Sequence, residues 1–296
     1  MTWVSTIAGA VLVAVGLRDI YATLWHPRGL GTVSRTIFAT LWRIVLPLSR
    51  RGKALASVGP LGIVVTAVTW AMFLVVGWAL IYLPHIVDGF YYSSSLTLQD
   101  SSNPVKALYV SIVTAATLGF GDITPAYSAL RIVIPIQALM GFILFTAAIS
   151  WVLQIYPALV ARRTTARKLS LLARTDGERT VREGEASIAH SVLSTTTDAL
   201  SSVDMNLAQY KETYYFRDPQ ADMSLAATAS YALTLAAAGS ESSSADVRKG
   251  ADMLLLQAGH LANRLDEFLN TGGSPEEVFR SYAENHRYAD TVPTDQ

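Results

Sequence analysis

Residues 114–125 read TAATLGFGDITP. Two glycines, Gly119 and Gly121, flank an aromatic residue, and Asp122 follows directly. This glycine-containing run interrupts a chain that is strongly apolar on both sides. Irregular backbone is tolerated at membrane depth only where protein covers it or where it lines a water-filled path. The stretch therefore predicts a loop that lines such a path.

Two charge-free apolar segments flank this stretch, residues 61–83 and residues 132–161. A helix of about 20 apolar residues spans the hydrocarbon core of a bilayer. The second segment exceeds that length, so its helix is expected to tilt or to extend beyond the membrane. Both segments are predicted to be transmembrane helices.

Residues 3–25 form a weaker third apolar segment, which Arg18 and Asp19 interrupt. A secretory signal peptide is the alternative, but no basic stretch precedes the apolar run and no small-residue cleavage site follows it. We therefore expect an uncleaved N-terminal transmembrane helix within residues 1–27. Arg18 and Asp19 are expected to pair with each other or to lie near the membrane face.

The net charge of zero hides an uneven distribution. Residues 1–170 hold 13 Lys and Arg against 4 Asp and Glu, whereas residues 171–296 hold 10 against 19. Basic residues gather at 26–60 and 162–168, and the segment 84–100 carries acids without bases. The positive-inside rule then places the N-terminus outside and the C-terminal half in the cytoplasm. The chain has no cysteine, which excludes disulfides and cysteine-based metal or redox sites.

The basic segment 28–60 contains one apolar helical face. The residues that share it are Ile37, Phe38, Leu41, Trp42 and Val45. Such a face is typical of an interfacial helix that lies on the inner leaflet. A cytoplasmic helix packed on the bundle is the alternative, and both interpretations remain open.

Residues 103–127 are too few to cross the membrane twice as helices. Asn103 and Pro104 form a helix start signal, and residues 107–116 are apolar. We expect a short helix at 104–116 that dips into the membrane and a loop at 117–122 that returns. An ion stripped of its water could pair with the loop carbonyls. A row of carbonyls facing one axis requires positive φ at some positions, which glycine adopts without steric cost.

With these residues in view, the stretch resembles the selectivity filter of the potassium channel family, whose common form is Thr-Val-Gly-Tyr-Gly followed by Asp. The positions that match the ion-coordinating signature are Thr117, Leu118, Gly119, Phe120 and Gly121. The resemblance also implies a cation-attracting acid at the outer mouth and a supporting threonine before the filter, matched by Asp122 and Thr114.

Two filter positions depart from the common form. Leu118 replaces Val, which is a mild change because the backbone carbonyl coordinates the ion. Phe120 replaces Tyr and lacks the hydroxyl that commonly tethers the filter to a neighbouring helix. Potassium selectivity is still expected, with a less rigid filter.

The resemblance covers about residues 61–161. It implies an outer helix at 61–83, a pore helix at 104–116, a filter at 117–122 and an inner helix at 131–157. The expected fold is an all-α membrane protein. It has a two-helix-plus-pore-loop potassium channel pore, an extra N-terminal transmembrane helix and a cytoplasmic α-helical domain at 170–285, followed by a disordered tail at 286–296. Gly141 is a candidate gating hinge, and close helix packing by a small residue is the alternative.

The function expected on this basis is passive potassium conduction across the plasma membrane. One chain supplies one filter strand, so a homotetramer is expected. No catalytic residues are visible, and neither a cofactor nor a metal beyond the permeant K⁺ is expected. The expected partners are membrane lipid, K⁺ and an unknown cytoplasmic regulator of the helical domain, with no nucleic acid among them. The sequence has no regularly spaced series of Arg and Lys residues, which a voltage sensor requires. It also has no Gly-x-Gly-x-x-Gly motif, which a Rossmann-type regulatory domain would carry.

Three alternatives stay open beside this function. The first is a membrane-anchored sensor or scaffold with a non-conducting pore-like domain. The second is a weakly selective cation channel, because selectivity depends on filter rigidity as well as sequence. The third is a potassium transporter, but that architecture places four pore-like repeats in one chain, and only one is found here.

In the C-terminal part, residues 186–235 and 245–284 are predicted to be helical, with breaks at 175–184, 218–222 and 239–244. Residues 251–265 show a 3–4 apolar period, and residues 274–277 are a helix start. His190 and His260 lack metal-ligand spacing and are expected to be ordinary histidines. His85 could sense external pH, but an ordinary interfacial histidine is the preferred interpretation.

Overall fold

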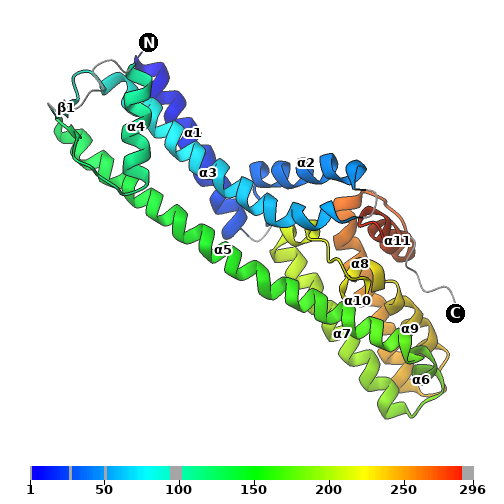
Figure 1. The fold of residues 1–296 in the computed structure, drawn as a ribbon. Helices are drawn as coiled ribbons and strands as arrows, with labels where there is room; N and C mark the ends of the chain where they lie inside the picture. Colours follow the sequence, from blue (N-terminus) through cyan, green and yellow to red (C-terminus); the bar gives the residue numbers. More distant parts are fainter. Residues whose placement is uncertain (1, 27–28, 50–51, 94–101, 289–296) are drawn as a thin grey trace. The chain divides into compact units, whose positions relative to one another are not determined.

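The computed structural model describes residues 2–26, 29–49, 52–93 and 102–288. The chain divides into two compact units (Figure 1). The membrane unit comprises Met1–His26, Leu30–Ser34 and Ile63–Leu153, and the C-terminal unit comprises Pro27–Gly29, Arg35–Gly62 and Gln154–Gln296. Several positions used to predict orientation and the tail lie outside the described residues, namely Arg28, Arg50, Arg51, Asp100 and residues 289–296.

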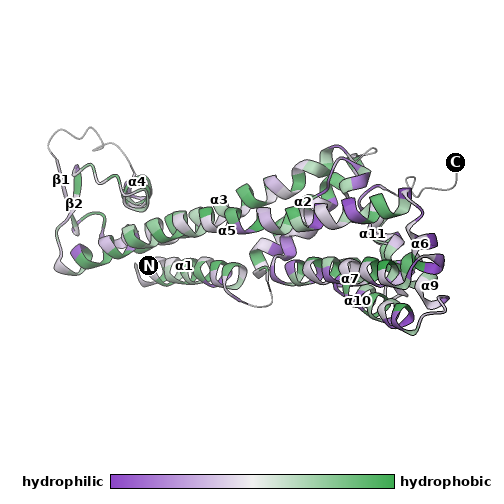
Figure 2. Cartoon of the chain, turned by 90° about the horizontal axis from the view of Figure 1, so that it is seen from below, coloured by the Kyte–Doolittle hydropathy of each residue, from purple (hydrophilic) through white to green (hydrophobic). Residues whose placement is uncertain are grey.

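Within the described residues, three helices are long and apolar enough to cross a membrane. They are α1 (Thr2–Leu24), α3 (Val58–Tyr82) and α5 (Ser128–Arg174). Hydrophobic residues cover α3 and the first part of α5 (Figure 2). The prediction of a mainly helical membrane protein with three candidate spans is confirmed.

The helix α5 is longer than the inner helix expected at 131–157. It has 47 residues and continues through Pro157 to Arg174. The sequence after Pro157 is rich in Ala, Leu, Arg and Lys, which are strong helix formers. Their summed propensity keeps the helix going despite the proline. Arg174 in the last turn complements the negative end of the helix dipole.

In the membrane unit, α1 packs closely against α3. A Cβ atom added at Gly9 would collide with the carbonyl oxygen of Gly77, so the two backbones approach as closely as small residues allow. Further along α1, Asp19 is buried, with 4% of its surface exposed. Its carboxylate accepts hydrogen bonds from Val33 N (2.8 Å), Ser34 Oγ (2.6 Å) and Trp70 Nε1 (2.9 Å).

These contacts correct the expectation that Arg18 and Asp19 pair or lie at the membrane face. Asp19 instead receives backbone and side-chain donors from the start of α2 (Thr32–Leu48) and from α3. The first N–H groups of a helix lack intrahelical partners and carry partial positive charge, so a buried carboxylate is well satisfied there. Arg18 is exposed.

The short helix expected at 104–116 is α4 (Asn103–Ala115). Its N-cap is Ser102, one residue before the predicted Asn103, and Pro104 lies in the first turn as expected. Two three-residue strands, β1 (Phe90–Tyr92) and β2 (Ile123–Pro125), pair antiparallel with Tyr91 opposite Thr124. This sheet was not predicted from the sequence. It ties the chain after α3 to the chain after the 117–122 loop.

The core of the membrane unit gathers around α4. Buried side chains from α1, α3, α4 and α5 form one cluster, which includes Val13, Leu74, Trp78, Tyr82, Ala107, Val110 and Leu130. In Figure 1, α4 lies between the ends of α3 and α5. The core therefore holds α4 in a fixed place relative to the two long helices.

The C-terminal unit is helical. Its helices after α5 are α6 (Gly177–Glu183), α7 (Ala186–Gln209), α8 (Leu225–Thr228), α9 (Tyr231–Ser240), α10 (Ala245–Leu269) and α11 (Pro275–Asn285). The predicted period of α10 is largely observed, with Leu254, Leu261 and Leu265 buried, but Leu255 is half exposed. The helix start at Ser274 is a capping box with Glu277.

The helical stretch expected at 186–235, with a break at 218–222, is interrupted over a longer interval, between Gln209 and Leu225. This interval holds two 3-10 turns, Lys211–Tyr215 and Ala221–Met223. Pro219 disfavours helical backbone at the residue before it, and Tyr214 and Phe216 are buried in the unit. Tertiary packing of these aromatic rings therefore outweighs local helix propensity.

The packing of α2 distinguishes between the two interpretations of the basic segment, an interfacial helix and a packed helix. Phe38 is fully buried and its ring stacks on Tyr215 at 5.5 Å between centroids. Trp42 is 4% exposed and lies 4.8 Å from the His286 ring, and its Nε1 donates to Asn285 Oδ1 (2.8 Å). The structure favours the alternative of a packed helix, whose apolar face is buried inside the C-terminal unit.

Candidate functional site

The candidate site is the 117–122 loop, and buried polar side chains hold the helix that leads into it. Ser111 Oγ on α4 donates to the Val75 carbonyl of α3 (2.7 Å). Gln137 on α5 donates to Ser111 O (3.0 Å) and Oγ (2.8 Å), and accepts from the Tyr82 hydroxyl (2.7 Å). Gln137, Ser111 and Tyr82 are each fully buried. Hydrogen bonds from both long helices therefore fix the depth and rotation of α4.

A defined backbone motif ends α4 and starts the loop. Thr117 N donates to Thr114 O (2.9 Å), and Leu118 N donates to Val113 O (2.9 Å). These two bonds form a Schellman motif, with Thr117 at the left-handed position that glycine usually fills. Thr117 has φ 57°, a conformation that is unusual for a β-branched residue. The predicted support residue Thr114 thus contributes its carbonyl oxygen to the turn.

The loop alternates in backbone conformation. Thr117, Gly119 and Gly121 have φ of 57°, 53° and 78°, and the residues between them lie outside this left-handed region. An alternation of this kind lets successive carbonyls point toward one axis, and glycine adopts the positive φ at no steric cost. The backbone geometry expected for the loop is therefore present at alternate positions.

The loop is uncovered within a single chain. Leu118 is 57% exposed and Phe120 is 65% exposed. A Cβ atom added at Gly119 or Gly121 would have no atom within 4 Å among the described residues. Among the described residues of a single chain, the Phe120 ring therefore leaves most of its surface unpacked.

Asp122 does not project freely. Its Oδ2 accepts a hydrogen bond from the hydroxyl of Tyr109 on α4, and its Oδ1 accepts from Ile123 N (3.0 Å). The backbone carbonyl of Asp122 accepts from Ser93 N (2.9 Å), next to β1. The loop is therefore tethered to α4 and to the strand segment, through an acid that the sequence predicted only as a charge at the mouth.

Gly141 lies against the end of α4. A Cβ atom at this position would collide with the carbonyl oxygen of Ala115. This contact gives the glycine a packing role, which is the alternative considered from the sequence. A gating hinge at Gly141 stays a prediction.

Three residues that hold the site were not predicted from the sequence, Tyr109, Ser111 and Gln137. Each is a hydrogen-bonding side chain inside an otherwise apolar segment. A polar group at membrane depth is expensive unless it has a partner, so such residues commonly face the protein interior. Their isolation in apolar sequence was the signal that could have identified them.

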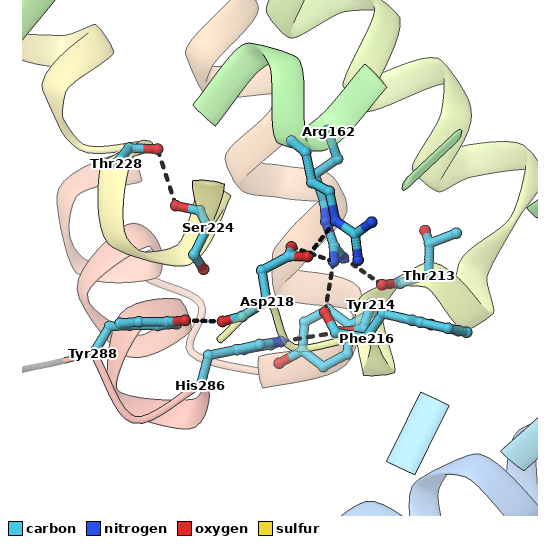
Figure 3. A network of polar contacts seen from close by, with 10 residues as sticks. Arg162, Thr213, Tyr214, Phe216, Asp218, Ser224, Thr228, His286 and Tyr288 are labelled. Atoms are coloured by element: carbon cyan, nitrogen blue, oxygen red, sulfur yellow. Dashed lines mark hydrogen bonds and ion pairs between the residues drawn. The ribbon is translucent and has the colours of Figure 1, made fainter. Parts of the chain in front are cut away.

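The C-terminal unit contains a second polar network (Figure 3). Arg162 on α5 is 6% exposed and donates to Phe216 O (2.6 Å), Thr213 O and Asp218 (2.9 Å). Arg163 also pairs with Asp218, whose backbone carbonyl accepts from the Tyr288 hydroxyl. Arg162 and Arg163 thereby bond α5 to the interrupted segment after α7, and Asp218 bonds that segment to Tyr288 after α11.

His286 is the buried histidine of this network. It is 1% exposed, and its Nδ1 and Nε2 lie 3.2 Å and 3.0 Å from the carbonyl oxygens of Tyr282 and Tyr214. Burial lowers the pKa of His286 to about 3, and the Arg162 charge adds to this effect. Residues 286–288 were expected to begin a disordered tail, but His286 and Tyr288 are both buried.

Three further histidines were considered from the sequence as possible metal ligands or pH sensors. His85, His190 and His260 are exposed. Within the described ranges, no group of three or more His, Asp or Glu side chains is placed to hold a metal ion.

Comparison with known proteins matches the part of the chain that contains the loop. Residues 68–156 match the model of a protein family described as ion channels. YdjJ, an uncharacterized membrane protein of Bacillus subtilis (strain 168), is 30% identical over 170 residues, which cover 55% of this chain and 47% of that protein. The chain therefore spans about half the length of this relative. No solved structure matches the chain.

The family match covers most of α3, all of α4, the 117–122 loop and the first part of α5. It supports an ion channel function for this part of the chain. The relative and the apolar helices together support a membrane location.

Proposed function

We propose that the chain is one subunit of a tetrameric, passive potassium channel whose filter is the 117–122 loop. The observation that carries the proposal is the alternation of left-handed backbone at Thr117, Gly119 and Gly121. Carbonyls arranged by such an alternation replace the hydration shell of a dehydrated cation. The resemblance of TLGFGD to the potassium channel signature supplies the choice of ion.

The exposure of the loop supports assembly of several copies. Phe120 and Leu118 are more than half exposed, and irregular backbone at membrane depth requires protein or a water-filled path around it. One loop cannot encircle an ion. Four copies around one axis would enclose the path with their carbonyls and leave Phe120 to pack on a neighbouring subunit.

The tether at Asp122 supports selectivity. Phe120 lacks the hydroxyl that commonly anchors the filter, but the Tyr109 hydroxyl bonds to Asp122 from α4. Because selectivity depends on how firmly the carbonyls are held, this bond favours a potassium-selective filter over a weakly selective one. Orientation follows the positive-inside rule, with the C-terminal unit in the cytoplasm and the channel in the plasma membrane.

The test is ion flux in liposomes that contain the purified full-length protein. We expect barium-sensitive K⁺ flux that exceeds Na⁺ flux, and its loss in Gly119→Ala, because alanine strains the left-handed backbone. Gly259→Ala is the matched control, since Gly259 lies in α10 with no atom within 4 Å of an added Cβ among the described residues.

Equal K⁺ and Na⁺ flux would replace the proposal with a weakly selective cation channel. Correctly assembled tetramers without flux at several pH values, and also after removal of the C-terminal unit, would favour a membrane-anchored sensor or scaffold.

A further inference from the structure

A small cavity lies inside the C-terminal unit, beside the buried Arg162. Its volume is ≈10 Å³, which is room for about one molecule of the size of water. Four polar side chains line it, those of Arg162, Asn206, Thr213 and Tyr282, and apolar side chains complete the walls. Every lining residue belongs to the C-terminal unit, so the cavity is part of that unit's packed interior.

The Arg162 guanidinium has one nitrogen without an acceptor. Its Nη1 donates to the Thr213 carbonyl, and its Nη2 donates to Phe216 O (2.6 Å) and to Asp218 Oδ2 (2.9 Å) (Figure 3). Its Nε is buried and has no hydrogen-bond partner among the described residues. Arg162 is 6% exposed, and a buried donor is costly to leave unpaired. The cavity that Arg162 lines is therefore where an acceptor for Nε is expected.

The other polar lining groups can also bond to a guest molecule. In the part of the chain that the structure describes, the Tyr282 hydroxyl forms no hydrogen bond, although Tyr282 is only 2% exposed. Burial raises the pKa of this hydroxyl to about 12, so it stays protonated at neutral pH and can both donate and accept. Thr213 Oγ1 donates to Tyr210 O (2.7 Å), which leaves its lone pairs free to accept. The Asn206 amide offers both a donor and an acceptor.

The size and the chemistry of the cavity decide what it can hold. A buried water molecule needs about 2–4 polar partners, and the walls supply both donors and acceptors. A halide ion is larger than water and can only accept, and Asp218 already balances the Arg162 charge. An apolar guest would leave Arg162 Nε without an acceptor. Water is the guest that fits all of these groups.

We propose that one ordered water molecule occupies this cavity. Its oxygen accepts from Arg162 Nε, and its hydrogen atoms bond to the Tyr282 hydroxyl and to Asn206 or Thr213. The water thereby completes the hydrogen bonds of the guanidinium and joins α5 to α11 and to the chain around the end of α7. Arg162 and Tyr282 are then positioning residues that act through the water. The site is independent of conduction and of the 117–122 loop.

The first test is an experimental structure of the full-length protein at a resolution that shows ordered water. We expect an isolated density peak at about 2.7–3.2 Å from Arg162 Nε. The absence of a peak at this position contradicts the proposal. Crystals grown with bromide separate water from an anion, because an anomalous peak beside Nε would assign the cavity to an anion and overturn the proposal.

A second test counts long-lived internal water in solution by ¹⁷O magnetic relaxation dispersion of the full-length protein. Ala158 lines the cavity, so Ala158→Val fills it and should remove one such water per chain. Ala237→Val is the matched control, because Ala237 is exposed. Tyr282→Phe keeps the ring and removes one partner, so the residence time of the water should fall several-fold. Tyr156→Phe on α5 should leave it unchanged, because Tyr156 is 57% exposed.

Each variant can contradict the proposal without the other. Equal water counts in Ala158→Val and wild type would do so, and so would an unchanged residence time in Tyr282→Phe. The wild-type density peak decides the matter even if Ala158→Val fails to fold.

Discussion

At the residue scale, the geometry of the loop depends on single hydrogen bonds. The Tyr109 hydroxyl bonds to Asp122 across 13 residues of chain. We predict that Tyr109→Phe lowers the K⁺ over Na⁺ permeability ratio several-fold, because the loop carbonyls are then held less firmly. The measurement is the shift in reversal potential under bi-ionic conditions. Tyr91→Phe is the control, since Tyr91 is 62% exposed, and an unchanged ratio in Tyr109→Phe would contradict a tethering role.

His286 makes a second prediction at this scale. Its pKa is lowered to about 3 by burial, so the folded protein holds it neutral while the unfolded chain protonates it below about pH 6.5. Because the unfolded state binds more protons in this window, the free energy of unfolding falls as pH drops from 6.5 toward 3. His286→Gln should flatten the slope between pH 6.5 and 5 by up to about 1.4 kcal/mol per pH unit. The free energy of unfolding, measured against pH with the exposed His190→Gln as control, checks this, and an unaltered slope contradicts it.

At the element scale, buried hydrogen bonds among Tyr82, Gln137 and Ser111 hold α4 in addition to its apolar packing. Replacement of Gln137 by Leu removes the acceptor of the Tyr82 hydroxyl and the donor to Ser111 in a buried place. Each lost partner costs roughly 1–3 kcal/mol, so we predict that Gln137→Leu destabilises the protein by about 2–4 kcal/mol. Thermal unfolding in detergent measures this. Gln154→Leu on the same helix is the control, because Gln154 is exposed. Equal destabilisation by the two changes would contradict a role of Gln137 in holding α4.

Elements were predictable from the sequence where one local rule dominated. Long charge-free runs identified α3 and α5, and the Asn103-Pro104 pair identified the start of α4 to within one residue. The left-handed backbone at Gly119 and Gly121 follows from the residue type. Thr117 is different, because its positive φ is imposed by the Schellman turn that ends α4 and not by any preference of threonine.

Other elements could not be predicted because contacts distant in sequence determine them. The β1–β2 pair joins residues more than 30 positions apart, and neither strand is long enough to show a period of two. The break after Gln209 reflects burial of Tyr214 and Phe216 against α2, α11 and the end of α5. Single-sequence patterns carry no information on such partners.

At the scale of the whole molecule, the C-terminal unit draws together segments from three parts of the chain. Arg162 is buried with Asp218 as its charged partner. Removal of one partner from a buried pair leaves an uncompensated charge, so we predict that Asp218→Asn destabilises the unit by about 3–5 kcal/mol. Asp222→Asn breaks the more exposed pair with Arg167 and should change stability by less than about 1 kcal/mol. Chemical unfolding of the full chain compares them, and similar losses would contradict the assigned role of Arg162.

The hydrogen bonds that the buried Asp19 carboxylate accepts also bear on the order in which the helices enter the membrane during synthesis. Its donors come from the start of α2 and from Trp70, which follows Asp19 by 51 residues. At about 5–20 residues per second, the ribosome needs roughly 3–10 s to add that length. During this interval a newly made α1 carries an unpaired carboxylate, which disfavours partition from the translocon into lipid by at most about 2.5–3.5 kcal/mol, the value at a helix centre. We therefore expect the first helix to integrate more favourably once the second is present, so that biogenesis of the membrane unit is cooperative rather than strictly sequential.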